Sequence, residues 1–578
     1  MKRIGLLLLW MLVSGAAIVA QNPARQATPP DVFLITIDTL RADHVRCYGY
    51  DRIETPTIDG LAKDGIRFTH AFTPSPVTNT SHTTILTGLL PSTHGVTDFA
   101  IPLASTHPTW AELLSTQRYH SAAFIGAVIL DSKALAPGLD RGFDFYDNFP
   151  EHPKTKARWG RVERRGMEVV EHAEAWLTAH PRGPHFVWVH LYDPHDPYEP
   201  PPPYSATYQD RLYDGEVAYA DSALKNFLAY LKSRSWYQNA LIIVVGDHGE
   251  GLGEHHEETH GIFLYDSTTH VPLIVKLPGR ATEARVVDAQ VRTTDILPTV
   301  LDLVNVSPPS RLDGQSLEAY LRGTDTANRT AFGETDYPLR FGWAPLRSVR
   351  TAGFKFIEAP RPELYDLRAD PGELNNTYAA GNTDAHQARA LLADLRAKAP
   401  PPSAPGDGAT AAGPETFQLP DPKDKIEEQN LLHRAMIASE GDQPTEARAA
   451  LEKVIKMDPM SAVALRQLGE LELQAGDYPQ AAGHLKAASR IRPDDAAAAY
   501  DLGRVLARTE DLAGARDALE ASLKLTPGQM AARILLGNVY LGLKNPVAAE
   551  DQFEAGLLLE PNNAEAKAGL VKVKAAQR

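Results

Sequence analysis

The stretch VFLITID at residues 32–38 decides the fold of this chain, because six apolar or β-branched residues end in an aspartate. A second run, LIIVVGDH at residues 241–248, has the same form and ends in Asp247 and His248. Short apolar runs of this length predict strands that are buried on both faces. Open α/β sheets place their chemistry at the carboxyl ends of such strands, so we expect Asp38, Asp247 and His248 to lie together. Two carboxylates and an imidazole suit a divalent cation.

Length and charge limit the classes of protein to which this chain can belong. At 578 residues it is too long for a single hydrophobic core, so we expect several domains. Lysine and arginine number 58 against 73 aspartates and glutamates, and the formal charge of −15 argues against a general nucleic-acid binder. Cys47 is the single cysteine, which excludes an internal disulfide. An anionic substrate would need a metal or histidines to offset its charge.

The amino terminus has the three regions of a secretory signal. Lys2 and Arg3 precede the apolar run GLLLLWMLV at residues 5–13, and small residues continue to Ala20. We expect residues 1–20 to be a cleaved signal peptide and the protein to be exported, either to the periplasm or to the extracellular space. The alternative is an uncleaved anchor, because the apolar segment is only slightly short of a membrane span, and membrane contact is expected only in that case.

The rest of the chain divides into three parts by its pattern. Residues 21–30 are a short polar tether, and residues 31–396 alternate apolar strand-like runs with amphipathic helix-like stretches, as in a layered α/β domain. The segment APPPSAPG at residues 399–406 opens a region rich in proline, glycine and alanine. This composition cannot bury a core, so we interpret residues 397–425 as a linker.

Beyond the linker the chain repeats itself every 34 residues. The period is kept by prolines, glycines and large apolar residues alike: Pro459, Pro493, Pro527 and Pro561; Gly469, Gly503 and Gly537; Leu451, Leu485, Leu519 and Phe553. This pattern resembles the tetratricopeptide repeat and implies an all-α solenoid with units 426–459, 460–493, 494–527 and 528–561 and a closing helix over 562–578. Such stacks present a concave surface, so we expect a protein or peptide partner, with a spacer as the alternative.

Residues 31 to about 395 resemble the sulfatase family of the alkaline-phosphatase superfamily. The resemblance is carried by motifs in a specific joint order: TIDTLRAD at 36–43, TG at 87–88, PHDP at 194–197, GDHGE at 246–250, HVPLI at 270–274, LYDL at 364–367 and DP at 370–371. It implies a layered α/β fold with a mainly parallel central sheet, a divalent metal and hydrolysis of a sulfate or phosphate ester.

The nucleophile segment departs from the sulfatase pattern. Sulfatases carry a cysteine or serine, converted to formylglycine, in a motif that continues with proline and arginine; here the corresponding residues are TNTSH at 78–82. Thr78 is a secondary alcohol that cannot give the aldehyde, so no formylglycine is expected. Phosphodiesterases and phosphoethanolamine-type transferases of the same superfamily use an unmodified threonine on the metal. We therefore predict Thr78 as nucleophile and metal ligand at the start of a helix through Leu86.

Three histidines complete the predicted site. His195 matches the sulfatase position that contacts the substrate anion, and His260 lies near the substrate-binding lysine of sulfatases. Both are predicted to bind the substrate and to carry protons. His82 replaces the motif arginine and is a further substrate-binding candidate. A second metal site made of Asp193, His195 and His260 is the less favoured alternative.

The ligand set also bears on the metal and on the reaction. Thr39 stands where many sulfatases have a second aspartate, which favours zinc or manganese over calcium, although calcium is possible. We interpret the acidic and histidine-rich stretch at residues 254–258 as a solvated loop near the mouth of the site. The first interpretation is an ester hydrolase that favours phosphoryl over sulfuryl transfer. The alternatives are a phosphoryl or phosphoethanolamine-type transferase and a catalytically silent sulfatase-like scaffold.

Overall fold

The computed structural model describes residues 29–150, 161–279, 284–398 and 418–577. The predicted signal peptide, most of the tether and most of the linker lie outside these residues. Within them, no helix combines the length and apolarity that crossing a membrane requires.

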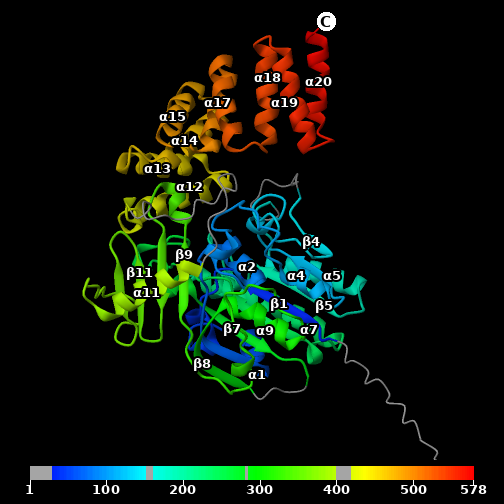
Figure 1. Ribbon diagram of the computed structural model, residues 1–578, viewed down its shortest axis with the longest axis vertical. Helices are drawn as coiled ribbons and strands as arrows, with labels where there is room; N and C mark the ends of the chain where they lie inside the picture. The colour runs from blue at the N-terminus through cyan, green and yellow to red at the C-terminus, as the bar shows by residue number, and fades with distance from the viewer. Residues whose placement is uncertain (1–28, 151–160, 280–283, 399–417, 578) are drawn as a thin grey trace, which may run out of the picture.

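An eight-stranded sheet forms the centre of the N-terminal domain, with the strand order β4-β3-β5-β1-β6-β7-β2-β8 (Figure 1). The central strand β1 pairs in parallel with β5 and β6, whereas β7 runs antiparallel to β6 and β2. The strands are β1 (Val32–Ile37), β2 (Ile66–Phe72), β3 (His120–Phe124), β4 (Phe145–Asp147), β5 (His185–Leu191), β6 (Leu241–Gly246), β7 (His270–Lys276) and β8 (Arg285–Arg292). The predicted mainly parallel sheet is confirmed.

Both faces of this sheet are covered, which explains the unbroken apolar run of β1. Successive side chains of a strand point to opposite faces. Accordingly, Val32 and Leu34 belong to one core, while Phe33, Ile35 and Ile37 belong to the other. The helices of this domain are α1 (Pro56–Asp64), α2 (Thr78–Thr87), α3 (Pro91–His94), α4 (Trp110–Ser115), α5 (Gly166–Ala179), α6 (Tyr204–Thr207), α7 (Leu212–Ser233), α8 (Asp266–Thr269), α9 (Ile296–Leu303) and α10 (Glu318–Leu321).

Helices from distant parts of the chain make up the two outer layers. The core on one face takes apolar side chains from α2, α4, α9 and α10, and the core on the other takes them from α1, α5 and α7. A second, four-stranded antiparallel sheet follows in the order β12-β11-β10-β9, and helix α11 packs on it. Its elements are β9 (Ala331–Thr335), β10 (Leu346–Arg350), β11 (Phe354–Glu358), β12 (Glu363–Asp366) and α11 (Thr383–Lys398).

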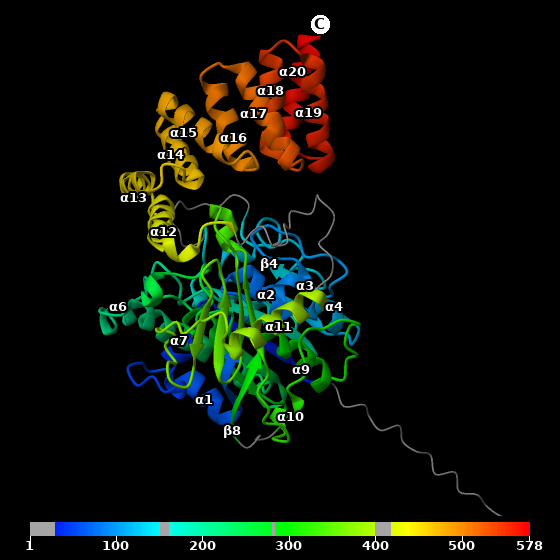
Figure 2. The ribbon, with the colours of Figure 1, turned by 60° about the vertical axis from the view of Figure 1, so that its left-hand side comes forward.

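The C-terminal region is a stack of paired helices that extends away from the N-terminal domain (Figure 2). Each 34-residue period holds two helices, and the small residue that recurs in the first helix lets the two approach closely. A Cβ on Gly503 would lie 2.6 Å from Cγ of Leu519. The helices are α12 (Ile426–Glu440), α13 (Pro444–Met457), α14 (Ala462–Ala475), α15 (Tyr478–Ile491), α16 (Ala496–Arg508), α17 (Leu512–Leu525), α18 (Met530–Gly542), α19 (Pro546–Leu559) and α20 (Ala564–Ala576).

Candidate metal centre

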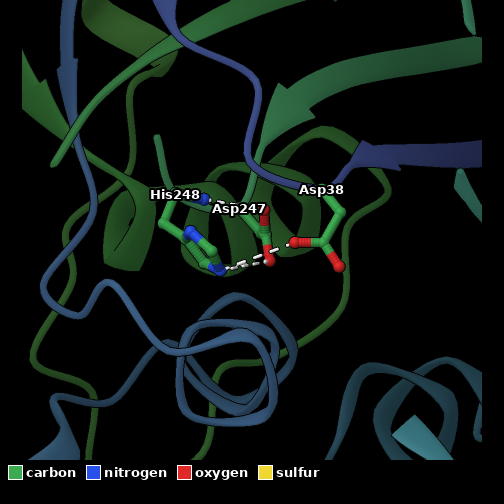
Figure 3. Close-up of side chains that lie close together, drawn as sticks. All are labelled: Asp38, Asp247 and His248. Carbon is green, nitrogen blue, oxygen red and sulfur yellow. Dashed lines mark hydrogen bonds and ion pairs between the residues drawn. The ribbon is translucent and has the colours of Figure 1, made fainter. Parts of the chain in front are cut away.

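The carboxyl ends of two neighbouring parallel strands bring three side chains together. Asp38 follows β1, while Asp247 and His248 follow β6 (Figure 3). One ligand atom from each residue lies within 4.8 Å of the other two, and all three side chains are fully buried. Nε2 of His248 is 3.5 Å from Oδ1 of Asp38 and 3.4 Å from Oδ2 of Asp247. The sequence-based expectation that these residues meet is therefore met in the fold.

The atoms that face one another in this cluster fit a divalent cation. Nδ1 of His248 lies 2.9 Å from the carbonyl oxygen of Gly249, so the ring N–H donates there and Nε2 turns a lone pair toward the carboxylates. Both carboxylate oxygens of Asp38, and Oδ2 of Asp247, are buried without a hydrogen-bond partner. Because such electron-rich atoms repel one another in a dry site, a cation between them would stabilise the arrangement.

Burial also sets the protonation of these groups. Desolvation raises the pKa of Asp38 and raises the pKa of Asp247 well above its usual range. Desolvation lowers the pKa of His248 to about 3, so its imidazole is neutral near neutral pH, which is the form that binds metals. A bound cation would favour the charged form of both carboxylates.

The backbone holds Asp247 in place through its other oxygen. Oδ1 of Asp247 accepts hydrogen bonds from the backbone N–H of Thr39, at 3.1 Å, and from its successor His248, at 2.7 Å. Oδ2 is thereby left for the centre of the cluster. The hydroxyl of Thr39 donates to the carbonyl of Pro194, so this side chain is engaged away from the three ligands.

Thr78 lies beside the cluster at the first residue of α2. Its Oγ1 is 3.1 Å from Nε2 of His248, and the residue is only 4% exposed. The helix runs to Thr87, close to the predicted end at Leu86. One turn along, the hydroxyl of Ser81 donates to the carbonyl of Asp247 at 2.6 Å, which ties the start of α2 to the end of β6. The structure thus brings Thr78 to the three predicted ligands.

His82 lies beneath Thr78 rather than beside it. Its Nδ1 is 2.7 Å from the carbonyl oxygen of Thr78, its Nε2 is 2.9 Å from the hydroxyl of Thr36, and its side chain is fully buried. Burial lowers the pKa of this histidine well below its usual range, so the ring is neutral. The role of His82 in binding substrate stays a prediction. Its hydrogen bonds show that the ring positions the backbone of Thr78.

His195 and His260 continue the row of imidazoles that starts at His248. The ring centroids of His248 and His260 are 4.4 Å apart, and those of His260 and His195 are 5.1 Å apart. Nδ1 of His260 is 2.9 Å from Oε1 of Glu250, a buried carboxyl whose pKa burial raises well above its usual range. Burial lowers the pKa of His260 to about 4. His260 and Glu250 can therefore share one proton at the edge of the metal centre.

Asp193 does not join His195 and His260. Its Oδ2 accepts a 2.8 Å hydrogen bond from the backbone N–H of Gly166, the first residue of α5, and its Oδ1 is 3.5 Å from Arg165. A carboxylate is favoured at a helix N-terminus. In the part of the chain that the structure describes, metal-ligand spacing is found for Asp38, Asp247 and His248. The second metal site considered from the sequence is not assembled.

Two nearby histidines were not selected from the sequence. Nε2 of His190, on β5, is 3.3 Å from Oδ2 of Asp38, and its Nδ1 accepts a hydrogen bond from Gly126. The alternation of side chains along β5 gives the face on which His190 lies, but not which strand lies beside it. His433, on α12 of the repeats, has its Nε2 2.7 Å from Oδ2 of Asp196. No sequence signal indicates this contact, because the repeat pattern reports packing between neighbouring units only.

The loop at residues 254–258 is exposed at Glu254, His256 and Glu258, as expected of a solvated loop, and Glu257 is the exception. Glu257 is 1% exposed, and its Oε1 accepts hydrogen bonds from the backbone N–H groups of Ile262 and Phe263. Burial raises the pKa of Glu257 to about 8. The carboxyl organises the turn that leads into His260, which a count of charges in the sequence cannot reveal.

Comparison with known families defines the class of this chain. Residues 30–306 match the sulfatase model, and residues 253–398 match the model of the C-terminal region of N-sulphoglucosamine sulphohydrolase. Tetratricopeptide-repeat models match residues 433–496, 466–529 and 506–573. The chain thus carries a sulfatase-family hydrolase domain of the alkaline-phosphatase superfamily, followed by tetratricopeptide repeats. Both predicted resemblances are confirmed.

Individual relatives cover the same part of the chain. The ulvan-active sulfatase of Formosa agariphila is 26% identical over 401 residues, which are 61% of this chain and 77% of that protein. The arylsulfatase of Clostridium perfringens is 24% identical over 437 residues, which are 60% of this chain and 90% of that protein. The crystal structure of the phosphonate monoester hydrolase of Agrobacterium radiobacter has a TM-score of 0.54 at 22% identity, covering 64% of this chain and 95% of that chain.

Proposed function

We propose that this protein is an exported, metal-dependent hydrolase of a sulfate or phosphate ester, with the unmodified hydroxyl of Thr78 as its nucleophile. The observation that carries the proposal is the 3.1 Å distance between Oγ1 of Thr78 and Nε2 of His248, beside buried carboxylate oxygens that have no hydrogen-bond partner. A threonine hydroxyl is a poor nucleophile near neutral pH and must be activated. A divalent cation bound there would lower the pKa of the hydroxyl and offset the negative charge of the ester.

Asp38, Asp247, His248 and Thr78 would hold the ion. Two carboxylates, one imidazole and one hydroxyl make a mixed nitrogen and oxygen set, which suits zinc or manganese. Calcium takes roughly six to eight oxygen ligands, so it fits this set less well. Thr78 lacks the primary alcohol or thiol from which formylglycine is made, and an unmodified hydroxyl favours phosphorus over sulfur as the centre that is attacked.

The chain's own groups account for the reaction. The oxygen of Thr78 attacks the phosphorus or sulfur atom, the bond to the leaving alcohol breaks, and water later cleaves the threonine ester. One water is consumed, and the alcohol and the inorganic anion are released. His260, paired with Glu250 through Nδ1, and its neighbour His195 stand where a proton can be passed to the alcohol and taken from the water.

The start of α2 adds electrostatic support. Thr78 is its first residue, and Ser81 is the first to donate its backbone N–H within the helix, to Val77 at 2.8 Å. The free N–H groups that precede it favour an anion at this end of the helix. The ten residues of α2 are all buried, so little water competes for these groups.

The remaining parts of the proposal rest on sequence. The N-terminal segment, at residues 1–20, supports export to the periplasm or beyond, with an uncleaved anchor as the alternative. The repeats support binding of a protein or peptide partner through their concave face. The net charge of −15 supports a substrate that is not a nucleic acid.

A parallel assay tests the reaction. Full-length protein loaded with zinc, manganese or calcium is given p-nitrophenyl sulfate, p-nitrophenyl phosphate, bis-p-nitrophenyl phosphate and a phenylphosphonate ester. We expect turnover of at least one phosphorus ester with zinc or manganese, and a loss of at least about a thousandfold in kcat for Thr78→Ala. Turnover that survives in Thr78→Ala rejects the nucleophile, and turnover of the sulfate alone rejects the preference for phosphorus.

A further inference from the structure

The first repeat helix is docked on the edge of the metal centre rather than held by a flexible tether alone. On α12, Asn430 donates to the carbonyl of His256 at 2.9 Å, and Arg434 makes a 2.6 Å ion pair with Glu258. Ile426, at the start of α12, belongs to a core built from the catalytic domain. These contacts hold the repeat array against the catalytic domain, which is the N-terminal domain that contains the metal centre.

A cavity of about 840 Å³ lies between the repeat array and the catalytic domain. The catalytic domain lines it with Asp98, Tyr337 and Phe341, among others, and the repeats line it with side chains from α12, α14 and the start of α16. Its volume falls in the range of roughly 300–1,000 Å³ that ligand pockets occupy.

Three residues that line this cavity each contact the residue that directly follows a site residue in the chain. His433 is 2.7 Å from Asp196, which follows His195. The carbonyl of Asp98 accepts a 2.9 Å hydrogen bond from Asn79, which follows Thr78. The ring of Tyr337 lies so close to Gly261, which follows His260, that a Cβ there would be 3.0 Å from it. Three residues that line the cavity thus contact residues directly next to the site.

The same hollow continues along the concave face of the repeats. A second hollow of about 290 Å³ shares Met436, Arg466 and Gln467 with the first. A third, of about 740 Å³ between α14, α16 and α18, shares Gln474 with the second. The three together form a track that begins where the repeats meet the catalytic domain and follows the inner helices.

The lining of this track fits a polypeptide better than an anionic glycan. In the first hollow the arginines are matched by aspartates: Arg340 lies 3.3 Å from Asp98, Arg492 lies 2.9 Å from Asp494 and Arg466 lies 3.8 Å from Asp495. No surplus of positive charge is left for a polyanion. Aliphatic side chains also line the track, among them Leu432, Met436, Val463, Leu473 and Ile534. Such side chains gain by burying apolar groups, which peptides offer along with amides.

We propose that the ester attacked by Thr78 is carried on a side chain of a polypeptide, whose flanking residues lie in this track between the two domains. The inference rests on the proposed function for the reaction, and it adds the class of substrate. The partner of the repeats and the substrate of the site are then the same molecule. A small ester uses the metal centre alone, whereas a peptide ester also gains binding energy from the track.

The test compares two exposed methionines of the first repeat. Met436 is 40% exposed and lines the track, whereas Met457, on α13, is 47% exposed and lines none of the three hollows. Full-length protein and the variants Met436→Asp and Met457→Asp are assayed with p-nitrophenyl phosphate, p-nitrophenyl sulfate and pools of 12-residue peptides. The peptides carry phosphoserine, phosphothreonine, phosphotyrosine or sulfotyrosine at the centre. A matched panel of phosphorylated and sulfated oligosaccharides is run beside them.

We expect kcat/KM for the best peptide pool to exceed that for the small ester by at least about a hundredfold. Met436→Asp should lower this ratio at least about tenfold, and Met457→Asp should leave it unchanged. Equal ratios in wild type and Met436→Asp overturn the proposal. A ratio that Met436→Asp lowers for oligosaccharides instead of peptides overturns the assignment to polypeptide.

A binding measurement separates this inference from the proposed reaction. Fluorescence anisotropy of the labelled peptide pools is measured with Thr78→Ala protein, with and without Met436→Asp. Peptide binding that Met436→Asp weakens at least about tenfold supports the track even if no ester is turned over, a result that would sink only the proposed reaction. No peptide binding to Thr78→Ala protein, or binding that is indifferent to Met436→Asp, overturns the inference.

Discussion

The catalytic domain and the repeat array bring residues together in opposite ways. In the catalytic domain, 208 residues separate Thr39 from Asp247, yet a hydrogen bond joins them at the metal centre. In the repeats, Gly503 meets Leu519 within one 34-residue unit, and each helix pair packs on its neighbours. A site that depends on distant segments should respond to one substitution as a whole, whereas a stack of local contacts should respond unit by unit.

The largest effect is expected where the distant segments converge. Asp38→Asn removes one of two buried carboxylates at the centre, so we expect kcat/KM to fall by at least about a thousandfold. Since the carboxylate of Asp247 then no longer faces a second carboxylate in the metal-free site, the melting temperature of the metal-free protein should stay the same or rise. Activity assays and calorimetry check both. Asp394→Asn, an exposed change on α11, is the control, and an active Asp38→Asn enzyme would break the comparison.

The next effect belongs to the repeats. Leu519 is fully buried beneath Gly503, and Leu519→Ala should destabilise the array by about 2–5 kcal/mol because it leaves a cavity. Leu525→Ala, on the same helix at 43% exposure, should cost much less. Urea unfolding is followed in two ways: the helical signal reports on the repeats, and ester turnover reports on the catalytic domain. If Leu519→Ala destroyed the catalytic transition as well, the two regions would not be independent.

A third effect depends on pH. The folded-state pKa of Glu257 is raised from 4.5 to about 8, so folding takes up a proton between these values. The stability that this group contributes is full below about pH 4.5 and is lost as pH rises through about 8, on the order of 5 kcal/mol. Glu257→Gln stays neutral and should flatten that decline. Melting temperatures from pH 5 to 8.5 measure it, and parallel curves for the two proteins would contradict the assignment.

The smallest effect is expected where the two regions touch. Arg434 and Glu258 form an ion pair in which both side chains are more than 40% exposed. Arg434→Ala should therefore shift stability by less than about 1 kcal/mol, and less still in high salt. Double-mutant cycles with Glu258→Ala give the coupling. A coupling of several kcal/mol would mean that the domains fold as one unit.

Local patterns in the sequence predicted much of this molecule. The apolar runs of β1 and β6, the helix that starts at Thr78 and the 34-residue repeat are all found, because each is set by residues near one another in the chain. The meeting of Asp38 with Asp247 and His248 followed from the rule for parallel strand ends.

The sequence could not predict the groups that tertiary packing places. His190 reaches Asp38 from a strand whose neighbours are known only once the sheet order is known. Asp193 was considered with His195 and His260 for the less favoured second metal site, but it turns to the start of α5 instead. His433 comes from a repeat helix, and the repeat pattern does not report which of its residues meet the catalytic domain. Such contacts depend on how whole elements pack, which spacing along the chain does not encode.

Metal content tests the central claim most directly. Wild type, Asp247→Ala and Thr78→Ala are stripped with chelator, reloaded with zinc or manganese, desalted and analysed by elemental mass spectrometry. We predict about one ion per chain in wild type, retention in Thr78→Ala, which keeps three ligands, and loss of at least about tenfold in occupancy for Asp247→Ala. A wild-type protein that holds no ion after reloading, or an Asp247→Ala protein that holds as much, would contradict the account.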